Sequence, residues 1–327
     1  MEIEKGLLSL LTPCYNGEKH IYRLLDSVLK QDYPSIEHFV IDDGSTDDTK
    51  SIIEKYIPLY EKKGYKLTYI YQENSGQSVA INRGLKLIKG EFFAWPDADD
   101  FYAVSFALSE LVNSLKVQDK TFSMVRSLLR YLDEDNLTEI SKTVNLFKNK
   151  TDLFEDCLFQ TNKFWYVPGT YLCRTETLFK VVKDKEIYTD KNAGQNWQLM
   201  LPLLFNYKCY TVDKYLYNVL VRRNSHSRES SFERNKLKLN SYENTIVSTL
   251  DRMIIPKEQL QYYMRKIIDN YVVMNINLYF DFADNTNGRE QYRLKKPKEL
   301  KLKVRYYLSF FPLGNLLFRI LVKLRVI

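Results

Sequence analysis

The chain of 327 residues is 45% hydrophobic and 27% charged, which is typical of a globular protein with enough core for one large or two small domains. Its formal net charge is +7, but residues 293–327 hold ten Lys or Arg and one Glu, so the rest of the chain carries a net charge of −2. A nearly neutral body argues against nucleic-acid binding.

The cysteines and the hydropathy pattern indicate the cellular compartment in which the protein works. Four cysteines are scattered without a C-x-x-C pair, which predicts reduced core residues rather than a disulfide framework or a zinc site. Residues 1–5 are too acidic for a signal peptide, and no uncharged stretch reaches the length needed to span a bilayer. We therefore expect a cytoplasmic protein.

Strand and helix patterns alternate over the first 117 residues. Four short apolar runs predict strands, at residues 7–11, 38–41, 67–71 and 92–95. Apolar residues at helical spacing predict helices between them, at 21–29, 45–56 and 79–88. Ser45 and Asp48 resemble a capping box for the second helix, and Gly90 is expected to end the third. This alternation predicts an α/β fold with a doubly wound, mostly parallel sheet and helices on both faces.

Three carboxylates follow the fourth predicted strand, at Asp97, Asp99 and Asp100. Carboxylates at this spacing repel each other, whereas a hard divalent cation takes oxygen ligands and would neutralise them. The alternative is an acidic loop in which Asp99 or Asp100 caps a helix that begins near Ala103. This segment alone leaves both interpretations open.

Polar residues also follow the other three predicted strands. They are Pro13, Tyr15 and Asn16 after the first, Asp42 and Asp43 after the second, and Asn74 and Gln77 after the third. The pair at 42–43 has a plain explanation as turn chemistry. However, the carboxyl ends of parallel strands meet at one edge of a sheet, so we expect all four sets to line one crevice.

Several segments resemble family 2 glycosyltransferases, in that family's order and spacing. They are LLTPCYNG at 10–17, SVLKQ at 27–31, VIDDGSTD at 40–47, NSGQ at 74–77, NRG at 82–84, and GEF at 90–92 leading to DADD at 97–100. The resemblance implies a GT-A fold that transfers a sugar from a nucleotide diphosphate with inversion at the anomeric carbon. It implies a GT-A domain at 1–229, with a nucleotide-binding half at 1–115 and an acceptor half at 116–229. A helical extension would follow at 230–327.

The resemblance also implies roles for individual residues. Pro13 and Tyr15 would give a uracil ring a flat surface, and Asp42 would accept a hydrogen bond from its N3–H. Asp97 would face the ribose or the metal, and Asp99 would ligate Mn²⁺ or Mg²⁺ bound to the diphosphate. The remaining candidates for binding the nucleotide sugar are Asn16, Asp43, Asn74, Gln77 and Asn82.

The acceptor half departs from the family pattern. Residues 168–174 resemble the strand that lines the sugar pocket. Gln195 and Asn196 fall where many relatives carry Glu-Asp, whose Asp is the general base. An amide can orient a hydroxyl group but cannot take its proton. A nearby carboxylate such as Asp190 could be the base, an unmatched residue could serve, or the protein could bind a nucleotide sugar without turning it over.

The last polar cluster is the basic segment RRNSHSR at 222–228. By resemblance, it would close over the diphosphate. His226 would complete the metal shell, and Arg222 or Arg228 would pair with phosphate. The alternative is a solvated basic loop. His20 and His38 are interpreted as surface or edge residues.

Beyond residue 230 the chain is expected to be helical, with a turn at 284–288. Apolar residues from Leu313 to Leu324 recur at helical spacing opposite Arg319 and Lys323. This amphipathic pattern suits a helix that lies on a membrane, so we expect peripheral contact through residues 293–327 at the inner face of the cell membrane. A helix packed against the body or a partner is the alternative.

Two functions are therefore open. The first is an inverting glycosyltransferase, UDP-dependent, that extends a glycan or a polyprenyl-linked acceptor in surface polysaccharide synthesis. The second is a non-catalytic subunit that binds a nucleotide sugar within a glycan assembly complex.

Overall fold

The structure is a computed structural model that describes residues 2–146, 148–190, 193–222 and 231–324. It divides into two compact units. The first unit contains Met1–Ser225 together with Asp251–Ile254, and the second contains the remaining C-terminal residues. Each unit is described by itself.

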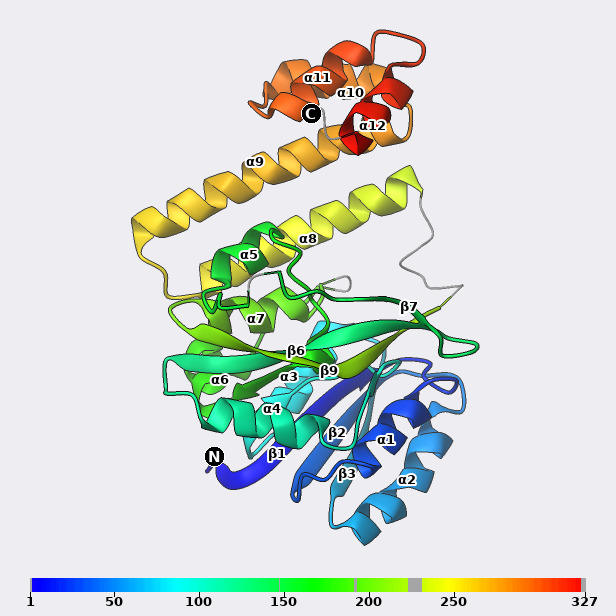
Figure 1. The fold of residues 1–327 in the computed structure, drawn as a ribbon, viewed down its shortest axis with the longest axis vertical. Coiled ribbons are helices and arrows are strands. Elements are labelled where there is room, and N and C mark those ends of the chain that lie inside the picture. Colours follow the sequence, from blue (N-terminus) through cyan, green and yellow to red (C-terminus); the bar gives the residue numbers. More distant parts are fainter. Residues whose placement is uncertain (1, 147, 191–192, 223–230, 325–327) are drawn as a thin grey trace. The chain divides into compact units, whose positions relative to one another are not determined.

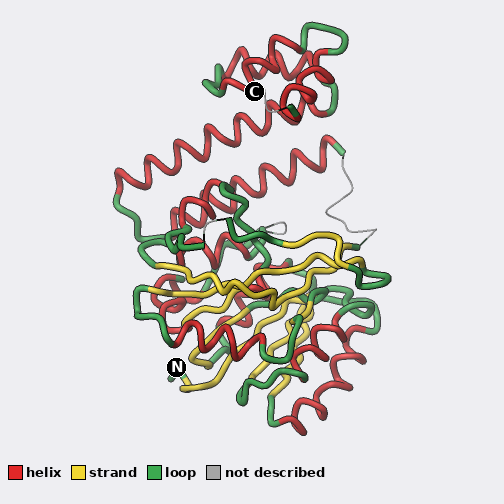
Figure 2. Tube along the Cα trace, viewed as in Figure 1, coloured by secondary structure: helices red, strands yellow, loops and turns green. Residues whose placement is uncertain are grey.

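The first unit is built on one curled sheet (Figures 1 and 2). In the described residues this sheet has nine strands in the order β3-β2-β1-β4-β8-β6-β9-β5, with β7 paired to β6. The strands are β1 (Glu4–Cys14), β2 (Ile36–Asp43), β3 (Lys66–Gln72), β4 (Gly90–Ala94), β5 (Phe101–Tyr102), β6 (Phe122–Asp133), β7 (Glu139–Lys142), β8 (Tyr171–Arg174) and β9 (Lys208–Val221). Strands β1 to β4 pair with one another in parallel, whereas β8 is antiparallel to both β4 and β6.

Helices connect the strands and cover the sheet. They are α1 (Ile21–Leu29), α2 (Thr49–Lys63), α3 (Gln77–Leu85), α4 (Ala107–Lys116), α5 (Phe154–Phe159), α6 (Thr175–Val181) and α7 (Asn196–Leu204). The chain moves outward from β1 to β3 through α1 and α2, and α3 then returns it to β4 on the other side of β1. Because such crossovers are right-handed, this reversal puts α3 on the opposite face of the sheet. It also opens a crevice at the carboxyl ends of β1 and β4.

The core lies where these helices meet the parallel strands. Leu8, Leu10 and Leu11 of β1 are fully buried. A Cβ on Gly84 of α3 would overlap the Leu11 side chain, so this glycine lets the helix pack closely on the strand. The interpretation of His38 as a surface or edge residue is wrong, because it is fully buried and hydrogen-bonded to Thr12 (3.0 Å) and Tyr60 (3.2 Å).

Two local predictions in the first unit are wrong, and one alternative interpretation is excluded. Helix α2 begins at Thr49 rather than at a capping box, and the Ser45 hydroxyl instead accepts a hydrogen bond from the Asn16 amide (2.8 Å). Gly90 begins β4, whereas α3 already ends at Leu85. The helix after the acidic cluster begins only at Ala107, so neither Asp99 nor Asp100 caps it.

The second unit is helical, as predicted. Its helices are α8 (Phe232–Arg252), whose last residues belong to the first unit, α9 (Lys257–Asp281), α10 (Asn285–Lys295), α11 (Leu300–Leu308) and α12 (Gly314–Lys323). The turn expected at 284–288 is instead the start of α10, where the Asp284 carboxylate accepts a hydrogen bond from the Asn287 amide. Ile276, Phe280 and Leu302 form a small core.

Two further predictions concern the whole chain. Cys14, Cys157, Cys173 and Cys209 are buried free thiols, as expected. In the described part of the chain, no helix combines the length and apolarity that crossing a bilayer would require.

Candidate functional site

A cavity of about 340 Å³ lies at the carboxyl ends of β1, β2 and β3. Its lining residues are Pro13, Cys14, Tyr15, Asp43, Asn74, Gly76 and Gln77. We call these residues the cavity wall. The structure thus brings together five of the residues that the sequence suggested for binding a nucleotide sugar. Cys14 and Gly76 were not predicted, although each is adjacent in sequence to a predicted residue.

The cavity wall is held by Asp43. One carboxylate oxygen accepts hydrogen bonds from the Ser75 amide (2.9 Å) and the Gln72 side chain (2.8 Å), and the other accepts from the Gly76 amide (2.8 Å). The Asn74 side chain donates to the Asp43 carbonyl (3.0 Å). A single carboxylate at the end of β2 therefore fixes the turn that follows β3.

Gly44 makes this close approach possible. Its φ is +84°, and a Cβ there would lie 2.7 Å from the Asn74 nitrogen. A side chain at this position would therefore be strained and would push the two loops apart.

Asp42 is not part of the cavity wall. It is buried, and its two carboxylate oxygens accept hydrogen bonds from the Ser45 amide (2.8 Å) and the Tyr69 hydroxyl (2.7 Å). The carboxylate that lines the cavity belongs to Asp43, one residue further along.

Two predicted asparagines tie segments together. The Asn16 side chain accepts from the Thr46 amide (2.9 Å), which joins the loops after β1 and β2. Asn82 of α3 donates to the Ile187 carbonyl (2.9 Å) and accepts from the Ile187 amide (2.8 Å). Neither residue lines the cavity, and each instead links two segments of the chain.

The acidic cluster after β4 is contacted by two segments that are remote in sequence. Arg222, which follows β9, forms an ion pair with Asp99 (2.6 Å), and the Leu220 amide donates to Asp100 (3.0 Å). The Gln195 side chain, just before α7, donates to Asp97 (3.2 Å). Of the basic segment predicted here, Arg222 is therefore at the cluster, whereas His226 and Arg228 lie outside the described residues.

The cluster is electrostatically strained. Burial, and secondarily the charge of Asp99, raises the pKa of Asp97, with Arg222 opposing the shift. Burial and both neighbouring carboxylates raise the pKa of Asp100 well above its usual range. The Gln195 side-chain oxygen is also buried without a hydrogen-bond partner. Crowded carboxylates beside an unpartnered amide oxygen are donors that suit a hard divalent cation.

The described residues do not form a complete metal shell. Among them, no group of three His, Cys, Asp or Glu side chains is arranged to hold an ion. Asp97 and Asp99 are two oxygen donors of the right kind, and the third predicted ligand, His226, lies outside the described part of the chain.

The two amides that replace the family's Glu-Asp pair, Gln195 (buried) and Asn196 (half-buried), both serve as hydrogen-bond donors. Gln195 holds Asp97, and the Asn196 side chain donates to the Tyr166 carbonyl (2.7 Å), which leaves the Asn196 side-chain oxygen buried without a partner. Asp190 is exposed on the loop before α7. Residues 168–174 form a short 3₁₀ turn and then β8, whose Tyr171 stacks on Trp95 with ring centroids 6.3 Å apart.

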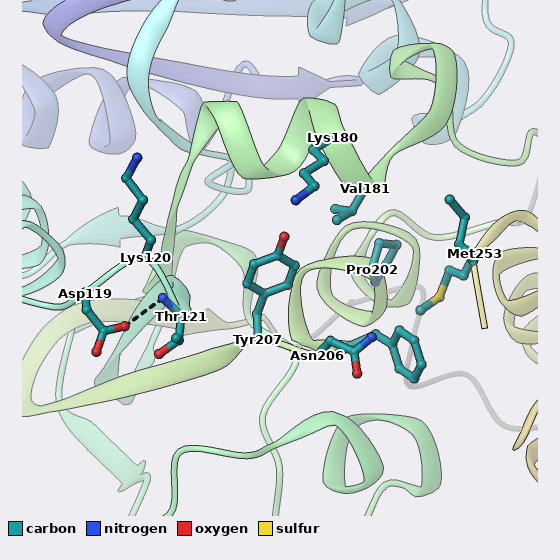
Figure 3. A pocket seen from close by; sticks show the side chains of 11 residues that line it. Asp119, Lys120, Thr121, Lys180, Val181, Pro202, Asn206, Tyr207 and Met253 are labelled. Carbon is teal, nitrogen blue, oxygen red and sulfur yellow. Dashed lines mark hydrogen bonds between the residues drawn. The ribbon is translucent and has the colours of Figure 1, made fainter. Parts of the chain in front are cut away.

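A larger cavity of about 660 Å³ lies elsewhere in the first unit (Figure 3). Its lining residues are Asp119, Lys120, Thr121, Lys180, Val181, Pro202, Phe205, Asn206, Tyr207, Met253 and Ile254. Arg174 at the end of β8 pairs with Phe92 near the start of β4. Since α6 follows Arg174, this cavity lies at the opposite end of the sheet from Asp97. Its lining contains a single carboxylate, Asp119, which accepts a hydrogen bond from the Thr121 amide (2.7 Å).

The sequence model of glycosyl transferase family 2 matches residues 9–186, more than half of the chain. The chain therefore belongs to this family, as the motifs at the carboxyl ends of β1 to β4 indicated.

Several curated proteins are similar to the chain. An uncharacterised glycosyltransferase of Rickettsia felis is 30% identical over 206 residues, which are 57% of this chain and 33% of that protein. TuaG of Bacillus subtilis, named for teichuronic acid biosynthesis, is 39% identical over 97 residues, 29% of this chain and 37% of that protein. The matched part spans about a third of the length of the curated relatives.

Solved structures share the fold. S. aureus TarS 1-349 in complex with UDP-GlcNAc has a TM-score of 0.62 at 19% identity, covering 93% of this chain and 87% of that one. The mannosyltransferase PcManGT from Pyrobaculum calidifontis, in complex with GDP-Man and Mn²⁺, has a TM-score of 0.54 at 16% identity, covering 95% and 83%. At these identities the likeness establishes the fold, and it confirms the predicted GT-A architecture.

Proposed function

We propose that this chain is an inverting glycosyltransferase that moves a sugar from a UDP-sugar to a hydroxyl group of a glycan or polyprenyl-linked acceptor in surface polysaccharide synthesis. The observation that carries the proposal is the cavity wall at the ends of β1, β2 and β3 in a family 2 chain, together with the acidic cluster that follows β4. The names of the relatives agree with it, since TarS binds UDP-GlcNAc and TuaG is named for a cell-surface polymer.

The cavity wall would bind the nucleotide. Tyr15 is exposed and lies beside Pro13, so the two offer a flat apolar surface to a base. Asp43 lines the cavity and Asp42 does not, so we assign to Asp43 the hydrogen bond to the base that the family pattern suggested for Asp42. Asn74 and Gln77 supply polar groups at the same wall.

The acidic cluster would meet the diphosphate. Asp97 and Asp99 would hold a divalent cation, Mn²⁺ or Mg²⁺, which when bound offsets the negative charge that develops on the departing diphosphate. Arg222 is already at Asp99 and would pair with phosphate oxygens. In the reaction, the acceptor oxygen forms a bond to the anomeric carbon, UDP leaves with the electrons of the broken bond, and a base takes the acceptor proton.

The remaining assignment is the general base that takes the acceptor proton. Asp190 stays the candidate because it is a carboxylate on the loop just before Gln195. We further propose that residues 1–115 form the nucleotide-binding half, residues 116–229 the acceptor half and residues 230–327 the helical extension. We also propose that the protein is cytoplasmic and works at the inner face of the cell membrane.

A second function is favoured by one observation. Both residues at the place of the family's Glu-Asp pair are amides that serve as hydrogen-bond donors to the protein itself. This arrangement also suits a subunit that binds a nucleotide sugar without turning it over.

Binding and turnover separate the two functions. Thermal shifts with UDP-, GDP- and CDP-sugars, each with and without Mn²⁺, should reveal stabilisation that needs both UDP-sugar and cation. Asp99→Asn should abolish it, while Asp119→Asn, at the opposite end of the sheet, should leave it unchanged. The non-catalytic alternative gives the same shifts but no acceptor-dependent release of UDP. Absence of any shift with nucleotide sugar and cation would overturn both functions.

A further inference from the structure

The last helix of the second unit exposes its aliphatic side chains. Leu313 is 70% exposed, Leu316 is 54% and Leu324 is 67%, and Leu317 and Ile320 are exposed as well. Their spacing puts them on one face of α12. A helix in a globular protein normally turns such a face toward the core. An exposed apolar face of this kind therefore indicates a surface that binds another molecule.

The orientation of α12 is held by contacts from its other side. The Asn315 side chain donates to the Asn285 side chain (2.9 Å), and the Phe318 ring lies under the Arg305 guanidinium, 4.9 Å from the ring centre. Arg305 is itself buried and paired with Asp281 of α9 (2.6 Å). Because these polar and aromatic contacts occupy the side of α12 that faces the rest of the second unit, the aliphatic face of the helix points toward solvent.

Exposed aromatic residues precede α12 in the chain. Tyr307, Phe310 and Phe311, at the end of α11 and in the connection to α12, are all exposed. We call these three residues, with Leu313, Leu316, Leu317, Ile320 and Leu324, the apolar surface. Aromatic rings are enriched at the boundary between lipid and water, where one part of the ring is wet and the rest is apolar.

Exposed lysines lie in the same part of the chain as the apolar surface. Lys295 is exposed at the end of α10, Lys296 and Lys298 are exposed in the segment that leads to α11, and Lys301 and Lys303 are exposed on α11 itself. Within the described residues, none of these lysines has an acidic side chain at ion-pair distance. This excess of unpaired cations complements an anionic surface and opposes the pairing of two identical copies, which would bring like charges together.

We propose that residues 293–324 dock on a bilayer that contains anionic phospholipids, with the apolar surface entering the interfacial region and the lysines contacting the headgroups. The inference goes beyond glycosyl transfer and does not require it. It gives the proposed enzyme a means to reach an acceptor that is held in the membrane.

The test is co-sedimentation of the full chain with vesicles of phosphatidylcholine alone and of phosphatidylcholine mixed with phosphatidylglycerol. We expect binding to the mixed vesicles that weakens with salt. Leu316→Gln combined with Ile320→Gln should lower the partition coefficient by about tenfold or more, because two apolar side chains no longer enter the interface. Lys301→Gln with Lys303→Gln should lower it by about fivefold per lysine, and only on anionic vesicles.

A matched control is Leu237→Gln, since Leu237 of α8 is 66% exposed in the same unit but lies outside the apolar surface. It should bind like the wild type. All the substituted residues are exposed, and circular dichroism and melting confirm that the variants fold.

The inference is overturned if the Leu316/Ile320 variant binds as well as the wild type, or if anionic lipid makes no difference. It is also overturned if that variant dissociates a dimer while no form of the protein binds vesicles. UDP binding and turnover are measured on the same samples, so a failure of the proposed function is distinguished from a failure of membrane docking.

Discussion

On the side of the crevice formed by β1 to β3, the polar groups that line the cavity also hold its walls, whereas on the side of α7 two buried amide oxygens have no partner. Asp43 accepts three hydrogen bonds from the turn after β3. By contrast, Gln195 and Asn196 each leave a buried oxygen unpaired. The polar groups of the first side pair with one another, while two oxygens of the second side accept no hydrogen bond from the described residues.

This difference bears on how each side would work. A preformed wall binds its ligand with little reorganisation, as expected for a nucleotide that every reaction cycle shares. The unpaired oxygens by α7 are buried, so a hydroxyl group or a water molecule would reach them only after a local rearrangement of this side.

The largest effect is expected from Asp43→Ala, which tests whether the first side depends on a single carboxylate. Three hydrogen bonds would be lost and two backbone amides of the 75–76 turn left unpaired, so the free energy of unfolding should fall by about 3–5 kcal/mol. Stabilisation by UDP should disappear with it. Urea denaturation and thermal shifts measure both.

Asp213→Asn is the control for Asp43, since Asp213 pairs with Lys148 at an exposed site. Its unfolding free energy should change by less than about 0.5 kcal/mol. A stable Asp43→Ala protein that still binds UDP would show that the wall is held by other contacts.

A second expected effect comes from His38, which is fully buried in β2, the strand that ends at Asp43. Burial lowers its pKa from 6.5 to about 3. Between these values the unfolded chain binds the proton and the folded chain does not, so stability is fully present above about pH 6.5 and is lost as the pH falls toward 3. The loss by pH 4 should be about 3 kcal/mol.

His38→Gln isolates this contribution from that of the carboxylates. The variant should be less stable at neutral pH but should lose less stability between pH 6.5 and pH 4 than the wild type does. Urea midpoints measured across that range give the comparison. Parallel pH profiles for the two proteins would show that His38 does not titrate in this way.

Asp43 and His38 also show which features of the structure the sequence could predict and which it could not. The strands could be predicted because short apolar runs have a local signature, and their carboxyl ends meet by topology alone. The burial of His38 could not, because Thr12 and Tyr60, its hydrogen-bond partners, are brought to it only by the fold.

The sequence could not tell which of Asp42 and Asp43 lines the cavity, for a similar reason. Strand β2 continues through both residues, and successive side chains in a strand point to opposite faces. The sequence marks the pair as important but does not tell which member faces the cavity. The predicted turn at 284–288 is the start of α10 because the same Asp-Asn chemistry serves both turns and helix caps.

Asn196→Asp tests the side of α7. The Asn196 amide donates to the Tyr166 carbonyl (2.7 Å), and a carboxylate there would face that carbonyl without a proton to share. We expect the unfolding free energy to fall by about 1–3 kcal/mol and acceptor-dependent UDP release not to increase. A rise in turnover would instead show that this position can act as the missing base.

The smallest effect is expected at Arg222, which forms an ion pair with the acidic cluster after β4. Its guanidinium is 2.6 Å from Asp99, so in the donor-free protein it competes with a cation for that carboxylate. Arg222→Gln should therefore tighten binding of Mn²⁺ alone by about fivefold, the worth of a half-exposed ion pair, while weakening binding of UDP, which loses a phosphate partner. Arg130→Gln, which removes an exposed pair with Glu139 on β6 and β7, should change neither affinity. Opposite shifts in the two titrations would identify Arg222 as a group that Asp99 and the diphosphate share, whereas weaker binding of both would mean that it only supports the local structure.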